Sequence, residues 1–123
     1  MDLKDDIRLV QNARRHAFVN EDEYSVGAVI KTKSGRKYTG CNIKINSTIN
    51  TCAEQVAIEK AISEGEREFE YIVVMGGKKN QEVEKYLPCE NCKKILKNFV
   101  DENFKIYTIY QNKVEEYSLS EIL

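Results

Sequence analysis

Tyr71-Ile72-Val73-Val74-Met75 is a continuous apolar run in the second half of the chain. Such a run indicates a strand with two buried faces, as found in sheets that are covered by helices on both sides. Gly76-Gly77 follows at once and is expected to end this strand. The run therefore predicts a sheet that lies between layers of helices.

The sequence on both sides of this strand alternates between helical and strand patterns. Apolar residues recur at helical spacing in residues 3–18, and a second helix is expected from about Thr51, which can cap it, to Gly65. A third helix should start near Cys89 and bury Cys92, Ile95, Leu96 and Phe99. The other expected elements are strands at 25–32, 36–41, 106–110 and 114–117, a short helix at 118–123, a loop at 42–51 and an irregular segment at 78–87.

Strands that alternate with helices in this way are typical of layered α/β proteins. We expect a three-layer α-β-α sandwich with a mixed five-stranded sheet, formed as a single domain by residues 1–123. Right-handed crossovers would place the N-termini of the second and third helices at one end of the sheet.

Composition and charge exclude several classes of partner. The net charge is −1, because 19 Lys and Arg residues are scattered among 20 Asp and Glu residues. A nucleic-acid-binding protein would normally carry a larger basic patch, so no nucleic acid partner is expected. No segment approaches the roughly 18 apolar residues of a membrane span, so no membrane association is expected either. The chain is predicted to be cytoplasmic, where four cysteines favour metal or catalytic roles over disulfides.

Two short cysteine motifs carry the chemistry. Cys52-Ala53-Glu54 stands at the start of the second expected helix, and Pro88-Cys89-Glu90-Asn91-Cys92 stands at the start of the third. Cys89 and Cys92 are three residues apart, which puts their side chains on one side of a helical turn. Three thiolate ligands leave a tetrahedral Zn²⁺ with one open position, as in catalytic zinc sites. The motifs have the C-x-E and P-C-x-x-C form of the zinc deaminase signature, in which Glu54 is the proton shuttle.

A structural zinc site is the alternative interpretation of the same cysteines. Cys41 could add a fourth sulfur to Cys52, Cys89 and Cys92, but Glu54 would then have no task. Cys41 is better explained as a small buried strand residue. Lys93 and Lys94 follow Cys92 directly, so they either offset the charge of the thiolates or lie exposed on the third helix.

These motifs and their surroundings resemble the cytidine deaminase family, including its blasticidin S deaminase branch. The resemblance runs from Glu23-Tyr24-Ser25-Val26-Gly27-Ala28, through Thr39-Gly40-Cys41-Asn42 and the two cysteine motifs, to Ser120-Glu121-Ile122-Leu123. It implies the cytidine deaminase fold, a small-molecule nucleoside substrate, a role in pyrimidine salvage and a homotetramer with sites near subunit interfaces.

The resemblance also implies an activity and a set of roles. The reaction would be hydrolytic deamination of cytidine, deoxycytidine or a related cytosine nucleoside to the uracil form. Zinc-bound hydroxide would attack C4 of the ring while Glu54 moves protons. Asn42 matches a position that binds a ribose hydroxyl, and Tyr24 one that lies near the pyrimidine. The backbone near Ala53 and the carbonyl just before Cys89 would hold the polar edge of the ring.

Three departures from the family pattern leave the substrate open. Asn42-Ile43-Lys44 replaces an N-x-E segment, so Lys44 stands where the family has a ribose-binding carboxylate. Gln55 replaces an Arg that commonly follows C-A-E. The chain ends at Leu123, where relatives often continue with a Pro and a Phe that closes a neighbouring site.

These departures keep other functions under consideration. The departure from N-x-E and the lack of Arg after C-A-E are similar to blasticidin S deaminases. Lys44 and the short segment before Cys52 favour an antibiotic deaminase as the second candidate. A protein of another class, with a structural zinc or a deaminase fold kept for binding alone, is the third. Nucleic-acid editing is disfavoured by the near-neutral charge.

Overall fold

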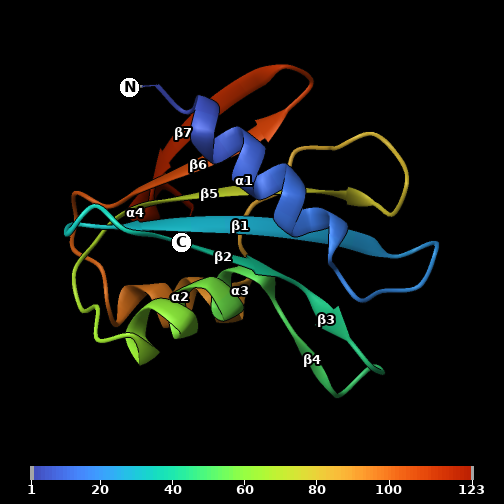
Figure 1. Ribbon diagram of the computed structural model, residues 1–123, viewed down its shortest axis with the longest axis horizontal. Coiled ribbons are helices and arrows are strands. Elements are labelled where there is room, and N and C mark those ends of the chain that lie inside the picture. Colours follow the sequence, from blue (N-terminus) through green and yellow to red (C-terminus); the bar gives the residue numbers. More distant parts are fainter. Residues whose placement is uncertain (1, 123) are drawn as a thin grey trace.

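The chain forms a five-stranded sheet with helices on both of its faces (Figure 1). A computed structural model describes residues 2–122. The helices are α1 (Lys4–Arg15), α2 (Ala53–Ser63), α3 (Glu90–Lys97) and α4 (Leu119–Ile122). The strands are β1 (Tyr24–Thr32), β2 (Lys37–Cys41), β3 (Ile43–Lys44), β4 (Asn50–Thr51), β5 (Phe69–Lys78), β6 (Lys105–Tyr110) and β7 (Lys113–Ser118).

The sheet is mixed, as the sequence predicts. Its strand order is β2-β1-β5-β6-β7, with β5 and β6 parallel and the other neighbouring pairs antiparallel. The apolar run from Tyr71 to Met75 lies in β5, the central strand, and is buried throughout. Burial on both faces explains why this run does not alternate with polar residues.

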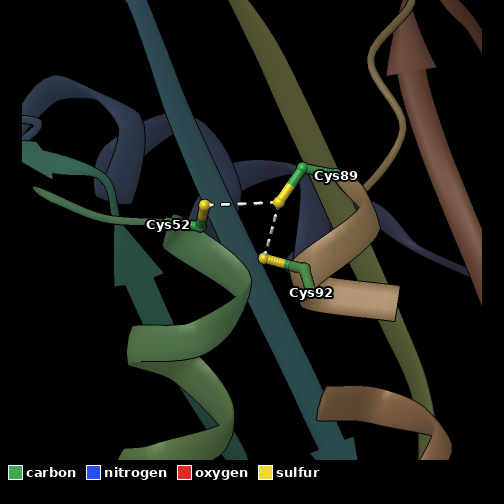
Figure 2. Close-up of side chains that lie close together, drawn as sticks. All are labelled: Cys52, Cys89 and Cys92. Atoms are coloured by element: carbon green, nitrogen blue, oxygen red, sulfur yellow. Dashed lines mark hydrogen bonds between the residues drawn. The ribbon is translucent and has the colours of Figure 1, made fainter. Parts of the chain in front are cut away.

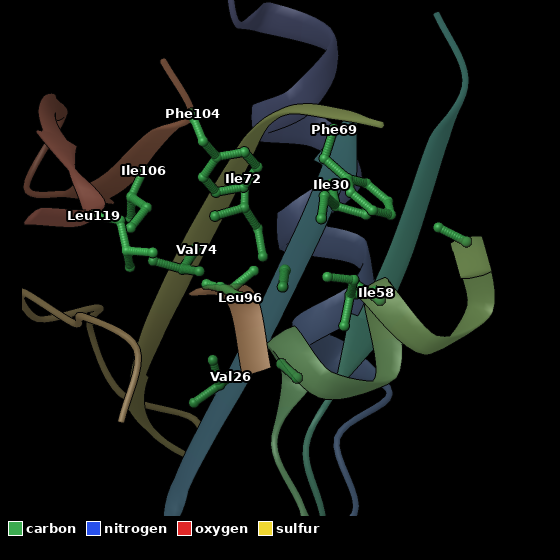
Figure 3. Close-up of a cluster of buried hydrophobic side chains, with 14 of the residues drawn as sticks. Val26, Ile30, Ile58, Phe69, Ile72, Val74, Leu96, Phe104, Ile106 and Leu119 are labelled. Atoms are coloured by element: carbon green, nitrogen blue, oxygen red, sulfur yellow. The ribbon is translucent and has the colours of Figure 1, made fainter. Parts of the chain in front are cut away.

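Two apolar clusters show that the sheet is the middle of three layers. One cluster joins Val10 of α1 to Val29, Val73 and Ile109 on one face of the sheet. The other joins Ile58 of α2 and Leu96 of α3 to Ile30 and Ile72 on the opposite face (Figure 3). The expected α-β-α sandwich is therefore confirmed.

Several expected boundaries are wrong. Gly76-Gly77 does not end β5, which pairs with β1 as far as Lys78. The expected loop at 42–51 contains the short hairpin of β3 and β4. The first helix ends at Arg15, so Phe18 is 65% exposed and its backbone pairs with the start of this hairpin. Phe99 lies beyond α3 and is 39% exposed rather than buried.

The terminal segments agree more closely with the sequence. The short helix expected at 118–123 is seen as α4, and its last expected residue, Leu123, lies outside the described residues. No helix within residues 2–122 is long and apolar enough to cross a membrane.

Gly40 holds α2 against the sheet, and this contact sets the position of the N-terminus of α2. A Cβ atom at Gly40 would lie 2.4 Å from the Ala53 carbonyl oxygen and 2.6 Å from the Ala57 nitrogen. Because both are backbone atoms, Gly40→Ala must push the whole helix away from β2. We expect Gly40→Ala to lower the free energy of unfolding by about 3 kcal/mol, measured by urea denaturation.

The control for this substitution is Gly35→Asn in the turn between β1 and β2. Gly35 has a φ of 96° and open space around it, and Asn tolerates positive φ better than other residues. This variant should change stability by less than about 1 kcal/mol. Equal stability losses in the two variants would contradict the close approach of α2 as the cause.

Candidate active site

The three cysteines of the two motifs meet where α2 and α3 begin (Figure 2). Cys52 occupies the N-cap position of α2, not Thr51 as the sequence suggested, and Cys89 occupies the N-cap of α3. Cys92 lies in the first turn of α3, so its side chain points to the same side as that of Cys89. The expectation that both helix N-termini lie at one end of the sheet is confirmed by this convergence.

The sulfur positions fit a tetrahedral zinc ion. The Sγ atom of Cys89 lies 3.6 Å from that of Cys52 and 3.4 Å from that of Cys92, and the three sulfurs are all within 4.8 Å of one another. Zn–S bonds of roughly 2.3 Å at tetrahedral angles separate sulfurs by about 3.8 Å. The three cysteines are free thiols, so each can lose its proton and bind the metal. The site therefore suits Zn²⁺ and keeps one coordination position open.

Cys41 does not belong to this site. Among residues 2–122, the sulfurs that cluster are those of Cys52, Cys89 and Cys92. Cys41 lies on β2, and burial raises the pKa of its thiol. This geometry disfavours the four-sulfur structural site that the sequence left open.

Glu54 lies next to the sulfurs and is 1% exposed. It stands in the first turn of α2, two residues after Cys52. Burial raises the pKa of its carboxyl to about 7, with a further contribution from the charge of Cys52. The Tyr86 hydroxyl donates to Oε2 of Glu54 at 3.1 Å. A buried carboxyl beside an open metal position is the arrangement expected of a general acid and base.

The N-termini of the two helices can offset the charge of metal-bound thiolates, whereas Lys93 is engaged elsewhere. Both N-termini place partial positive charge at the sulfurs. Lys93 instead donates to the carbonyl of Ile122 and pairs with Glu90 at 3.1 Å, so it joins α3 to α4. Gln55 donates to Glu59 at 3.1 Å, one turn further along α2.

A cavity of about 360 Å³ opens beside Cys52, large enough for a nucleoside. Its walls come from β1, the β3–β4 hairpin, the start of α2 and the segment before α3. The lining residues are Tyr24, Val26, Asn42, Ile43, Lys44, Ser47, Asn50, Thr51, Cys52 and Tyr86. Three of the side chains predicted to bind substrate, those of Tyr24, Asn42 and Lys44, are therefore brought together in one cavity.

These cavity residues also make contacts within the protein. Asn42 accepts a hydrogen bond from the Val26 nitrogen at 2.8 Å and donates to the Tyr24 carbonyl at 2.9 Å, which ties β1 to the segment before β3. Lys44 forms an ion pair with Glu23, and the Tyr24 hydroxyl donates to Glu84. Lys44 therefore lines the cavity as a cation that is already paired with a carboxylate.

Sequence reasoning missed Tyr86, which belongs to the segment expected to be irregular. This segment packs on β5 where the chain has Gly76, because the Glu84 nitrogen donates to the Gly76 carbonyl at 2.8 Å. A Cβ atom at Gly76 would lie 3.0 Å from Cγ of Tyr86. A glycine inside an otherwise buried strand often marks such a close approach, so Gly76 is the signal in the sequence that indicates this contact.

A family model for the cytidine and deoxycytidylate deaminase zinc-binding region matches residues 2–108. The chain belongs to this deaminase family. Its members are zinc-dependent hydrolases, and the cluster of Cys52, Cys89 and Cys92 at the start of α2 and α3 is suited to bind such a zinc ion.

Relatives of the deaminase chain support this family along its whole length. It is 31% identical to a cytidine deaminase of Halalkalibacterium halodurans, with 100% of this chain and 92% of that protein covered. It is 29% identical to one of Sporosarcina psychrophila, with 100% and 89% covered. A blasticidin-S deaminase of Bacillus cereus is 27% identical over 80% of this chain and 76% of its own length.

The solved structure of a cytidine deaminase from Burkholderia pseudomallei supports the fold. It superposes with a TM-score of 0.83 at 26% identity and covers 100% of this chain and 97% of its own. The mixed sheet with helices on both faces is thus the fold of this family.

Proposed function

We propose that this protein hydrolyses the exocyclic amine of cytidine, deoxycytidine or a related cytosine nucleoside, releasing ammonia and the uracil nucleoside. The observation that carries the proposal is the buried Glu54 carboxyl beside three clustered sulfurs. Family membership and whole-length relatives named cytidine deaminase support the same reaction.

Glu54 has the position needed to move protons during this reaction. When bound to Cys52, Cys89 and Cys92, zinc supplies a Lewis acid that makes water nucleophilic at neutral pH. Glu54 accepts a proton from the attacking water and delivers it to N3 of the ring. Glu54 then takes the second proton from the hydroxyl that now stands on C4 and delivers it to the amine, which leaves as ammonia, so the carboxylate is regenerated.

The ring is proposed to be held mainly by backbone groups. Ala53 is the first residue of α2, where amide N–H groups lack partners within the helix. Its backbone and the Pro88 carbonyl, just before Cys89, would bind the polar edge of the pyrimidine. The ring of Tyr24, which is 39% exposed at the cavity wall, would contact the base.

The sugar is proposed to lie between Asn42 and Lys44. The Asn42 Nδ2 group keeps a second hydrogen after its bond to Tyr24, and this hydrogen can donate to a ribose hydroxyl. Lys44 stands at the same cavity and is held by Glu23. A cation here also favours an antibiotic such as blasticidin S as a second candidate substrate.

A homotetramer is part of the proposal. Large apolar side chains are exposed next to the cavity on the β3–β4 hairpin and beside it: Phe18 is 65% exposed, Ile45 65% and Ile49 57%. Burying such a patch against a second copy would be favourable. A cytoplasmic location is proposed as well, because a reducing compartment keeps the four cysteines as free thiols.

A substrate panel tests the proposed function. Zinc-loaded protein is given cytidine, deoxycytidine, cytosine and blasticidin S, and ammonia release is measured together with the product spectrum. We expect turnover of cytidine or deoxycytidine at a kcat on the order of 1–100 s⁻¹. Faster turnover of blasticidin S would assign the second candidate function, and no turnover of any member would refute deamination.

A further inference from the structure

We propose that Tyr86 is a positioning residue that holds the Glu54 carboxylate in the orientation needed for proton transfer. The proposal rests on the proposed deaminase function. It is carried by the contacts that fix Tyr86, by its hydrogen bond to Glu54 and by its place on the cavity wall.

Tyr86 is fixed by the strand beneath it. It lies in the segment between β5 and α3, and this segment is tied to β5 by the bridge between Gly76 and Glu84. The side chain at Gly76 is only a hydrogen, which leaves room for the Tyr86 ring directly above the strand. The ring also packs against the apolar cluster under α2. The hydroxyl is therefore presented from a rigid support.

The Tyr86 hydroxyl meets both oxygens of the carboxylate. It lies 3.1 Å from Oε2 and 3.4 Å from Oε1 of Glu54. The long Glu side chain has several rotatable bonds, so a fixed donor at its end restricts where the carboxylate points. A carboxylate buried away from water also needs such a donor to offset the loss of hydration.

Tyr86 also lines the cavity next to Cys52, so it borders both the carboxylate and the space for the base. A displacement of about 1 Å in a reacting group can cost on the order of 100-fold in rate. Losing the hydroxyl should therefore slow the chemical step more than it weakens substrate binding.

The test compares Tyr86→Phe with Tyr38→Phe, each as zinc-loaded protein. Tyr38 lies on β2, outside the cavity. It is a matched control, because its hydroxyl also donates to a carboxylate, that of Glu66, at 3.3 Å. We expect Tyr86→Phe to lower kcat about 30-fold with KM changed less than about 3-fold and with zinc content unchanged. Tyr38→Phe should keep kcat within about 2-fold. A higher KM with unchanged kcat in Tyr86→Phe would make Tyr86 a wall of the cavity only and overturn the proposal.

A second measurement needs no substrate. The melting temperature of the zinc-loaded protein is compared for Tyr86→Phe, Glu54→Ala and the double variant. We expect Tyr86→Phe to lower the melting temperature by about 4 °C when Glu54 is present and to have almost no effect when it is absent. Equal shifts of the melting temperature with and without Glu54 would show that Tyr86 does not act through Glu54 and would overturn the proposal. If the wild type deaminated none of the nucleosides, the proposed function would fail, and this coupling would still decide whether Tyr86 holds Glu54.

Discussion

Replacing Glu54 with Gln should lower kcat for the cytosine nucleoside by at least about 1,000-fold, because the amide cannot accept a proton from water. Gln has nearly the same volume as Glu, so the tight burial of this position, which is 1% exposed, is kept. Zinc content should remain at one per chain, since the three sulfurs are untouched. Steady-state ammonia release and metal analysis together measure the result.

Glu59→Gln is the matched control for this substitution. Glu59 lies on the same helix but is exposed, and it accepts a hydrogen bond from Gln55. Its replacement should leave kcat within about 2-fold. The Glu54→Gln protein should also melt no lower than the wild type, because burying a neutral amide costs less than burying a carboxylate. Retention of a tenth or more of the wild-type kcat in Glu54→Gln would remove Glu54 from the mechanism.

Replacing Cys89 with Ala should abolish zinc binding and activity together. Cys89 stands between the other two sulfurs, at 3.6 Å from that of Cys52 and 3.4 Å from that of Cys92. Two thiolates bind the metal much more weakly than three, so the zinc content should fall below about 0.1 per chain. The kcat should fall by at least about 1,000-fold. The melting temperature should fall as well, because the zinc joins α2 to α3.

Cys41→Ala is the control that separates a catalytic site from a structural one. Cys41 lies on β2 outside the sulfur cluster, so this variant should keep one zinc per chain and full activity. Metal analysis after dialysis against a weak chelator gives the comparison. Loss of zinc from Cys41→Ala would instead favour the four-sulfur structural site and count against an open coordination position.

The parts of the fold and site that follow local rules could be predicted from sequence. The run from Tyr71 to Met75 predicts a buried strand because burial on both faces demands apolar residues in succession. The sulfurs of Cys89 and Cys92 lie side by side because three residues make about one helical turn. The roles of Glu54, Asn42, Tyr24, Ala53 and Lys44 stay predictions until the variants and substrates are measured.

The predictions from sequence were wrong where the conformation or contacts of a residue depend on a neighbour that is distant in the sequence. Gly76-Gly77 has the composition of a strand end, yet both residues stay in β5 because the chain beyond them returns to pack on the same place. Lys93 follows a zinc ligand in sequence, yet its ammonium group reaches the end of α4. Adjacency in sequence does not specify the direction of a long side chain on a helix.

The sequence by itself determined the reaction chemistry, since three thiols and a carboxyl at the starts of two helices leave few other functions for those residues. Tertiary structure decided which groups surround that chemistry. The Tyr86 hydroxyl reaches Glu54 across a separation of 32 residues, and Lys44 meets Glu23 across 21. Such contacts depend on how the layers pack, and no periodicity or motif in the chain encodes them locally.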